Sequence, residues 1–214
     1  MSHRDTDNNL DKVQKLYTKN WQSYGCDSRS VGWKDEESHT LRFQKLVQVI
    51  QESSDIIEIS VNDYGCGYGA MFQYLDELPY ISLVKYYGYD ISKVMLTAAE
   101  KYIADERAQW LNSKDISSEA DYSFVSGTFN VRFDASDEVW RKFIEETLLK
   151  MGHMSKSGFA FNLLSTYVDW REEHLYYGDP YYYFDFCKTR ISKYVSLLHD
   201  YPLYEWTICV RLED

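Results

Sequence analysis

Apolar residues along the chain follow two spacings, one typical of strands and one typical of helices. Short apolar runs of strand length occupy residues 56–62, 83–89, 108–112, 121–126 and 158–167. Apolar residues three and four positions apart indicate amphipathic helices over residues 10–21, 38–52, 71–78, 92–102 and 136–151. Ser92 and Ser136 are the expected N-caps of the last two helices. Strands that alternate with helices predict an α/β fold with a mostly parallel sheet.

The C-terminal part of the chain follows a different pattern. Residues 194–199 and 203–211 are two predicted strands, and Asp200-Tyr201-Pro202 between them is a typical turn sequence. Strands joined by a tight turn are antiparallel, so we expect the sheet to be mixed at one edge. The preceding residues, 170–188, are rich in tyrosine and predict one more short helix.

The first predicted strand runs into a glycine-rich turn, residues 63–69, with the sequence D-Y-G-C-G-Y-G. Three glycines in five residues allow the backbone to approach a ligand without interference from Cβ atoms. With Ala70, the turn formally satisfies the dinucleotide fingerprint G-x-G-x-x-G/A. However, the carboxylate of Asp63, two residues before the first glycine, would repel a bound pyrophosphate. A ligand that is cationic at this point fits the turn better.

Composition and charge narrow the class of protein. At 214 residues the chain is long enough for one domain with a substantial core. A net charge of -11 and an isoelectric point near 4.9 argue against nucleic acid as the main partner, because phosphate binding requires a basic face. No apolar run approaches the roughly 20 residues that span a membrane. The polar first nine residues lack an apolar signal region.

The four cysteines are Cys26, Cys66, Cys187 and Cys209, and they form neither a C-x-x-C pair nor a spacing typical of zinc sites. We therefore expect a cytoplasmic protein that binds no metal, no nucleic acid and no membrane. A monomer and a homodimer are both compatible with the sequence.

Taken together, these features resemble the class I S-adenosylmethionine-dependent methyltransferases. The likeness rests on residues 63–69 after a strand, Asp90 at the end of the next strand, and Ser126-Gly127 at a further strand end, and it covers roughly residues 56–166. It implies a Rossmann-like, seven-stranded sheet, mostly parallel with an antiparallel C-terminal edge strand, and helices on both faces.

Residues 126–131, 161–169 and 174–177 further resemble small bacterial methyltransferases whose substrates are poorly defined. The family resemblance implies a single domain, residues 1–214. Within it we expect an N-terminal helical lid (1–54), a cofactor-binding core (55–166), and an acceptor-side segment with the terminal strand pair (167–214).

The resemblance implies S-adenosylmethionine as the cofactor. Asp63 and the glycine turn would bracket its methionine portion, and Asp90 would accept hydrogen bonds from both ribose hydroxyls. Asp115 and Ile116 would meet the adenine, and Arg42 is a candidate partner of the methionine carboxylate. The predicted cofactor-binding residues are Trp33, Arg42, Asp63, Gly65, Cys66, Gly67, Asp90, Ile91, Asp115, Ile116, Ser126 and Gly127.

Methyl transfer requires the nucleophile, the methyl group and the sulfur in line, so positioning supplies most of the rate. A hydroxyl acceptor also needs a base. His174 is the leading candidate because it follows a strand end, and Asp169 and Tyr177 are alternatives. By contrast, His39 and His153 are expected at the surface or at helix ends.

The aromatic residues near His174 have two possible roles. They form the wall of an acceptor pocket, where tyrosine offers both stacking area and a hydroxyl, or belong to an edge helix that packs on the sheet, or do both. These residues are Trp170, Tyr176, Tyr177, Tyr181, Tyr182 and Tyr183.

The small size of the chain and its lack of a basic face favour a small-molecule acceptor, such as a sugar or another metabolite hydroxyl. Transfer to oxygen and transfer to nitrogen both stay open. Two other functions remain as alternatives: an NAD(P)-dependent oxidoreductase, and a non-catalytic accessory protein that binds the cofactor.

Overall fold

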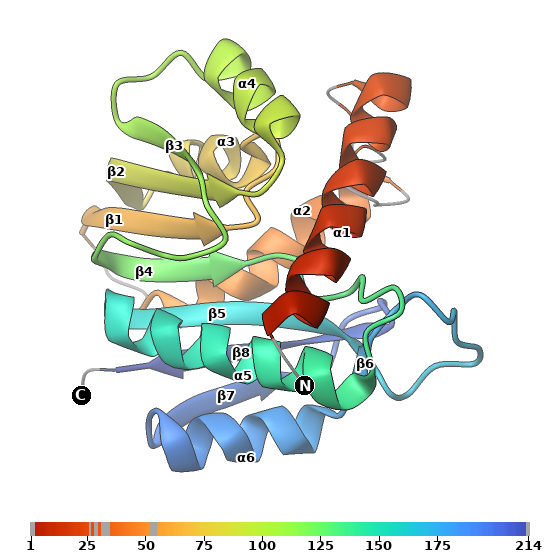
Figure 1. Ribbon diagram of the computed structural model, residues 1–214. Helices are drawn as coiled ribbons and strands as arrows, with labels where there is room; N and C mark the ends of the chain where they lie inside the picture. The colour runs from red at the N-terminus through yellow and green to blue at the C-terminus, as the bar shows by residue number, and fades with distance from the viewer. Residues whose placement is uncertain (1–2, 26, 28–29, 31–34, 52–54, 213–214) are drawn as a thin grey trace.

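The computed structural model describes residues 3–25, 27, 30, 35–51 and 55–212. A central twisted sheet separates two layers of helices (Figure 1). Helices α5 and α6 cover the front face in that view, and α2 and α3 lie behind the sheet. This arrangement confirms the predicted α/β class with helices on both faces.

The sheet has seven strands in the order β3-β2-β1-β4-β5-β8-β7, and the two-residue strand β6 pairs with β5 outside this path. The strands are β1 (Ile57–Tyr64), β2 (Ile81–Asp90), β3 (Ala108–Asn112), β4 (Ala120–Val125), β5 (Ser155–Ser165), β6 (Tyr177–Gly178), β7 (Tyr194–Leu198) and β8 (Glu205–Arg211). Strand β8 alone runs against its neighbours, β5 and β7. The antiparallel strand is therefore C-terminal, as predicted, but it lies one strand in from the edge, because it pairs on both sides.

The helices are α1 (His3–Tyr24), α2 (Glu36–Leu46), α3 (Ala70–Asp76), α4 (Lys93–Tyr102), α5 (Asp137–Met154) and α6 (Pro180–Arg190), and a short 3-10 turn, η2 (Val47–Val49), continues α2. The predicted caps are confirmed, since the hydroxyls of Ser92 and Ser136 accept hydrogen bonds from backbone N–H groups of α4 and α5. Asp179 caps α6 in the same way, and Pro180 occupies its first turn.

The core is divided between the two faces of the sheet. Side chains alternate along each strand, so Phe159, Phe161 and Leu163 of β5 belong to the cluster that packs against α5 and α6. Ala160, between them, belongs to the cluster formed with α2 and α3. In the described part of the chain, no helix is long and apolar enough to cross a bilayer.

A buried ion pair joins α2 to the start of strand β8. Arg42 donates from Nε and Nη2 to the two carboxylate oxygens of Glu205, each at 2.8 Å. Only 1% of Glu205 is exposed. Asn162 of β5 donates to the same carboxylate at 3.1 Å and accepts from the backbone N–H of Gly127 at 2.6 Å. These bonds connect α2, β8, β5 and the loop after β4.

We predict that Glu205→Ala lowers the free energy of unfolding by about 3–5 kcal/mol, because it leaves the buried Arg42 charge without its partner. Asp134→Ala is the matched control. Asp134 pairs with Lys12, but its side chain is 80% exposed, and its loss should cost no more than about 1 kcal/mol. Urea unfolding of both variants measures the difference. Equal losses would contradict the role assigned to the buried pair.

Candidate functional site

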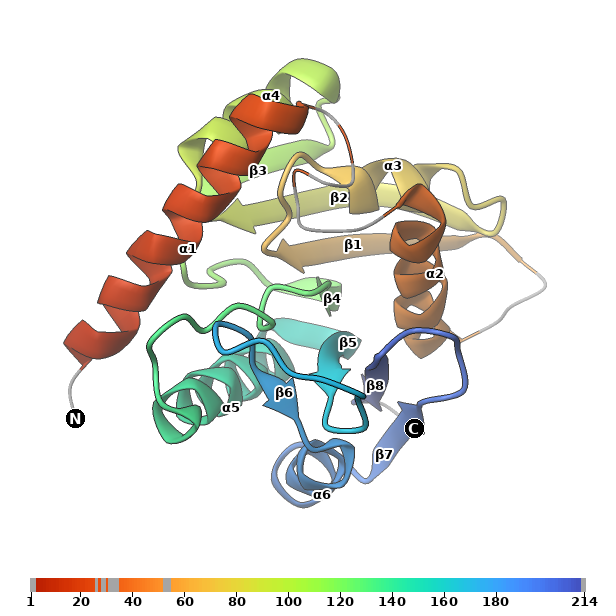
Figure 2. The same ribbon diagram turned by 90° about the vertical axis from the view of Figure 1, so that its right-hand side faces the viewer.

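A cavity with an empty volume of about 920 Å³ opens where strands β1, β2 and β4 end. Its walls come from these strand ends, from the glycine turn, and from faces of α1, α2, α4 and α5. Figure 2 looks onto this edge of the sheet, with α1 crossing one side of it. The carboxyl edge of a parallel sheet is the usual ligand site in open α/β folds.

The glycine turn can adopt its shape only without side chains at key positions. Gly65, Gly67 and Gly69 all have positive φ, at 80°, 56° and 88°. A Cβ atom at Gly65 would lie 2.0 Å from Oγ1 of Thr128, a residue that also lines the cavity. The turn is therefore held against the loop after β4 at a distance that only glycine allows.

Asp90 fixes the turn from the end of β2. Its carboxylate accepts hydrogen bonds from the backbone N–H groups of Gly67 at 2.9 Å and Ser92 at 2.7 Å. Burial raises the pKa of Asp90 to about 6, and these backbone bonds oppose the rise. A carboxylate has about four acceptor positions, so Asp90 keeps acceptor capacity for a ligand in the cavity.

Asp63 is the second acid in the cavity wall, and it is only 3% exposed. The hydroxyl of Tyr86 donates a hydrogen bond to it. Burial raises the pKa of Asp63 to about 7, opposed by the Tyr86 bond and increased by Asp90. No lysine or arginine is among the described residues that line the cavity. The site therefore favours a ligand with positive charge near these carboxyls.

The loop after β4 supplies a buried polar atom that faces no protein partner. Oγ of Ser126 is buried and, among the described residues, has no hydrogen-bond partner. Ser126 and Gly127 both line the cavity. A buried hydroxyl without a partner is costly, so this atom fits a polar group of a bound molecule.

Helix α1 passes beside the ends of strands β1, β2 and β4 (Figure 1). Leu10, Val13 and Tyr17 of this helix line the cavity. Burial and the nearby Asp90 raise the pKa of Tyr17 to about 12. At its C-terminal end α1 contacts the glycine turn, since the ring centroids of Trp21 and Tyr68 lie 6.1 Å apart. That the N-terminal residues 1–54 act as a lid stays a prediction.

The predicted cofactor-binding residues fall into two groups. The first group lines the cavity and comprises Asp63, Gly65, Cys66, Gly67, Asp90, Ile91, Ser126 and Gly127. The second group lies elsewhere: Asp115 is exposed, Ile116 is in the core, and Arg42 binds Glu205. On the loop that carries Asp115, Ser113 is the residue that lines the cavity. Trp33 lies outside the described residues.

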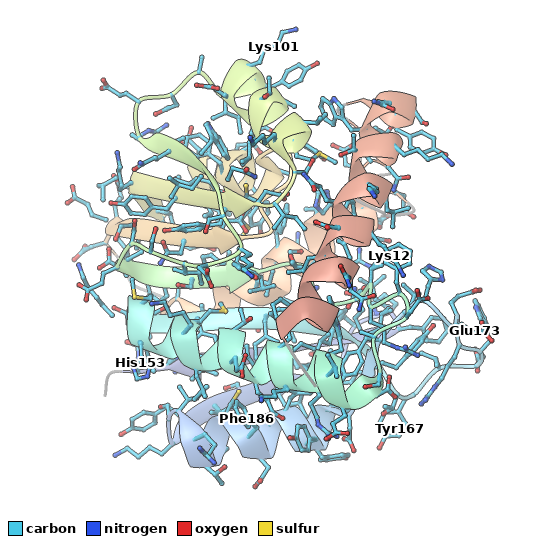
Figure 3. All side chains as sticks on the ribbon, in the orientation of Figure 1. Lys12, Lys101, His153, Tyr167, Glu173 and Phe186 are labelled. Carbon is cyan, nitrogen blue, oxygen red and sulfur yellow. The ribbon has the colours of Figure 1, made fainter. Side chains whose placement is uncertain are left out.

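The predicted catalytic residues are not brought to the cavity wall. His174, Asp169 and Tyr177 lie on the segment after β5, and none of them lines the cavity. A bridge between Val131 and Leu175 and the pairing of β6 with β5 direct this segment outward. Figure 3 shows Glu173 at its outer tip, away from the strand ends.

The aromatic residues of this segment follow the second of the two expected roles. Tyr183 is fully buried against Trp206, with ring centroids 5.6 Å apart, and its hydroxyl lies 2.8 Å from that of Tyr176. Trp170 and Tyr181 are exposed. No residue of this set is among the described residues that line the cavity. Tyr183 belongs to α6 and is part of the core cluster on that face of the sheet.

His39 is a cavity residue that the sequence prediction missed. The expected place near a helix end is confirmed, since His39 lies in the first turn of α2. The expected surface position is wrong, since His39 is 7% exposed and lines the cavity, with its ring centroid 4.6 Å from that of Phe43. Burial and the neighbouring Arg42 lower the pKa of His39 to about 4. One signal was available, because positions 39, 43, 46 and 50 share one helical face.

The described residues contain no group of three or more His, Cys, Asp or Glu arranged to hold a metal ion.

Comparison with known proteins gives one close relative in sequence and many in fold. No protein-family model matches the chain. The chain is 46% identical over 155 residues to a Mycobacterium tuberculosis protein named "Putative methyltransferase Rv1506c". The matched region covers 71% of this chain and 92% of that protein.

Solved structures share the fold at low sequence identity. Magnesium protoporphyrin IX methyltransferase from Synechocystis PCC 6803, crystallised with bound S-adenosylhomocysteine, has a TM-score of 0.67 at 10% identity, over 96% of this chain and all of that one. The N-methyltransferase NodS from Bradyrhizobium japonicum has a TM-score of 0.59 at 11% identity, over 85% of this chain and all of that one.

We predict that Gly65→Ala destabilises the protein more than Gly25→Ala. Both residues have positive φ, where a non-glycine residue costs about 1–2 kcal/mol, but a Cβ at Gly25 meets nothing within 4 Å. The excess for Gly65 reflects the collision with Thr128, and Thr128→Ala should remove part of it. Urea unfolding of the three variants and the double variant provides the test, and equal costs at the two glycines would count against the close approach.

The raised pKa of Asp63 also predicts a pH dependence of stability. Between pH 4 and pH 7 the folded protein keeps a proton on Asp63 that the unfolded chain, with a pKa near 3.8, has released. The free energy of unfolding should therefore fall as pH rises through this window, by up to about 1.4 kcal/mol per pH unit for one proton. Asp90, whose pKa burial raises to about 6, adds to this fall in stability in the lower part of the same pH window.

Asp63→Asn should flatten this slope, whereas Asp185→Asn, at an exposed position of α6, should leave it unchanged. Urea unfolding at pH 5, 6 and 7 gives the slopes. A slope that is the same in wild type and Asp63→Asn would show that Asp63 is not the titrating group.

Proposed function

The chain belongs to the class I S-adenosylmethionine-dependent methyltransferases, and we propose that it transfers a methyl group to a hydroxyl of a small molecule, either a sugar or another metabolite. The relative from Mycobacterium tuberculosis carries the family assignment, since its identity extends over most of both chains.

The observation that carries the proposal is the pair of carboxyls, Asp63 and Asp90, in a cavity whose described lining has no basic side chain. S-adenosylmethionine bears an ammonium and a sulfonium and lacks phosphate, so its charges complement these groups. A nicotinamide dinucleotide would place a pyrophosphate against the same two acids. This electrostatic argument favours the methyl donor over the oxidoreductase alternative.

The residues present fit such a cofactor. Asp90 has acceptor capacity for the ribose hydroxyls, and the glycine turn leaves backbone close to the ligand. Oγ of Ser126 offers a hydrogen bond that no described protein group uses, and Tyr17 closes the cavity from α1. When bound, the cofactor supplies a methyl group that its sulfonium activates.

The assignment of a small-molecule acceptor is supported by the site and the surface charge. The net charge of -11 disfavours nucleic acid. The cavity is also partly closed by α1, which leaves room for a compact acceptor rather than a polymer. Transfer to oxygen is favoured because His39, a group that can take a proton, is in the wall.

We predict that S-adenosylhomocysteine binds the protein and raises its melting temperature, whereas NAD(H) does not. Asp90→Asn keeps the shape of the side chain but removes its charge. It should weaken binding of S-adenosylhomocysteine by about 10- to 100-fold, since hydrogen bonds to a charged group contribute about 1.5–3 kcal/mol. Thermal unfolding measures the melting temperature. Titration calorimetry measures the binding of S-adenosylhomocysteine by wild type and Asp90→Asn, with Asp185→Asn as the surface control.

Stabilisation by NAD(H) but not by S-adenosylhomocysteine would instead support an oxidoreductase. Tight cofactor binding without methyl transfer to any member of a broad panel of hydroxyl and amine acceptors would point to a non-catalytic accessory protein.

A further inference from the structure

His39 lies on α2, which is anchored to strand β8, and the order of the strands separates β8 from the predicted ribose site at the end of β2. Arg42, one turn after His39, is bound to Glu205 at the start of β8. In the strand order β3-β2-β1-β4-β5-β8-β7, β8 and β2 lie on opposite sides of β1 and β4. Asp90 ends β2, so His39 is anchored toward the end of the cavity away from Asp90. This is the end at which an acceptor would meet the methyl group.

Arg42 fixes the turn of helix that carries His39. Its guanidinium donates to the backbone carbonyl of Ser38 at 2.8 Å and binds Glu205 through two further nitrogens. A bidentate ion pair of this kind sets geometry as well as energy. The stacked ring of Phe43 supports the imidazole from the next turn.

Three other titratable groups in the cavity wall form hydrogen bonds within the fold. The hydroxyl of Tyr64 donates to the carbonyl of Lys114 at 3.0 Å, and that of Tyr89 accepts from the backbone of Ser117 and Ser118. Asp63 is bound by Tyr86. Among the described lining residues, His39 is the only histidine.

The walls around His39 indicate what kind of acceptor fits. Leu10 and Val13 of α1, Phe43 of α2 and Phe143 of α5 are apolar lining residues. An anionic acceptor would meet no basic side chain in this lining and would be repelled by Asp63 and Asp90. The lining therefore suits an uncharged molecule with an apolar or aromatic body.

From this arrangement we propose that His39 is the base for an acceptor that is an uncharged aromatic hydroxyl compound. The inference rests on the proposed function. As the hydroxyl oxygen bonds to the methyl carbon, the carbon–sulfur bond breaks and its electron pair stays on sulfur. The hydroxyl proton passes to a ring nitrogen of His39, which later returns it to solvent.

The ionisation of His39 agrees with an acidic hydroxyl. Burial and Arg42 lower its pKa to about 4, so the ring is neutral at pH 7 and able to accept a proton. A base this weak removes a proton more readily from a phenol than from a sugar hydroxyl. The low pKa of His39 therefore favours phenols over sugars among the acceptors of the proposed function.

The test starts without turnover. Protein labelled with ¹⁵N in its histidines is saturated with S-adenosylhomocysteine, and phenol is then added while the ring resonances are followed by NMR. The His39 signals, assigned by their loss in His39→Asn, should shift, and those of His153, exposed at the end of α5, should not. Failure of phenol to bind, or shifts that spare His39, would overturn the proposal.

Rates of methyl transfer then show whether His39 acts as a base or only supports the structure. With S-adenosylmethionine and phenol, His39→Asn should be at least about 100-fold slower than wild type. Pentafluorophenol is already ionised at neutral pH and should bind less tightly in this acidic lining. At saturating pentafluorophenol, the loss in kcat caused by His39→Asn should be far smaller. His153→Asn should match wild type on both. Equal rates of wild type and His39→Asn on phenol would overturn the proposal.

The two proposals fail in distinguishable ways. Calorimetry with S-adenosylhomocysteine precedes both experiments. Absence of cofactor binding would overturn the proposed function and this inference together, whereas cofactor binding without any response of His39 to phenol would overturn only the inference.

Discussion

The carboxylate of Asp90 is the constraint on which the site depends. It binds the backbone of the glycine turn through Gly67 and the start of α4 through Ser92. It thereby holds together two segments that converge at the carboxyl edge of the sheet. Because both bonds go to backbone N–H groups, the acid shapes the cavity wall while keeping acceptor capacity toward the cavity. A single side chain thus links the local fold to ligand recognition.

A second set of buried polar bonds extends this order across the sheet. Asn162 holds the backbone of Gly127 and also binds Glu205, which in turn binds Arg42 of α2. The loop beside the predicted cofactor and the helix that carries His39 are thus connected through one chain of hydrogen bonds. Polar groups buried in this way are stable only when every member is satisfied, which makes the relative placement of the two walls well defined.

Local signals account for what the sequence predicted well. The glycine turn, Asp63, Asp90 and the serine caps are each specified by neighbouring residues, and they occupy the expected places. Arg42 and His39 were misplaced because their environment depends on Glu205, 163 positions from Arg42. His174 follows a strand end, but non-local pairing by β6 and the Val131–Leu175 bridge directs its loop outward. Spacing along a helix face was the one sequence signal that pointed to His39.

The most direct test of the central claim is a crystal structure of the protein with S-adenosylhomocysteine. The account predicts ribose hydroxyls within hydrogen-bonding distance of the Asp90 carboxylate, with the amino group of the ligand on the side of Asp63 and the glycine turn. Density for the ligand at any other surface, or in the cavity with the ribose away from Asp90, would contradict it.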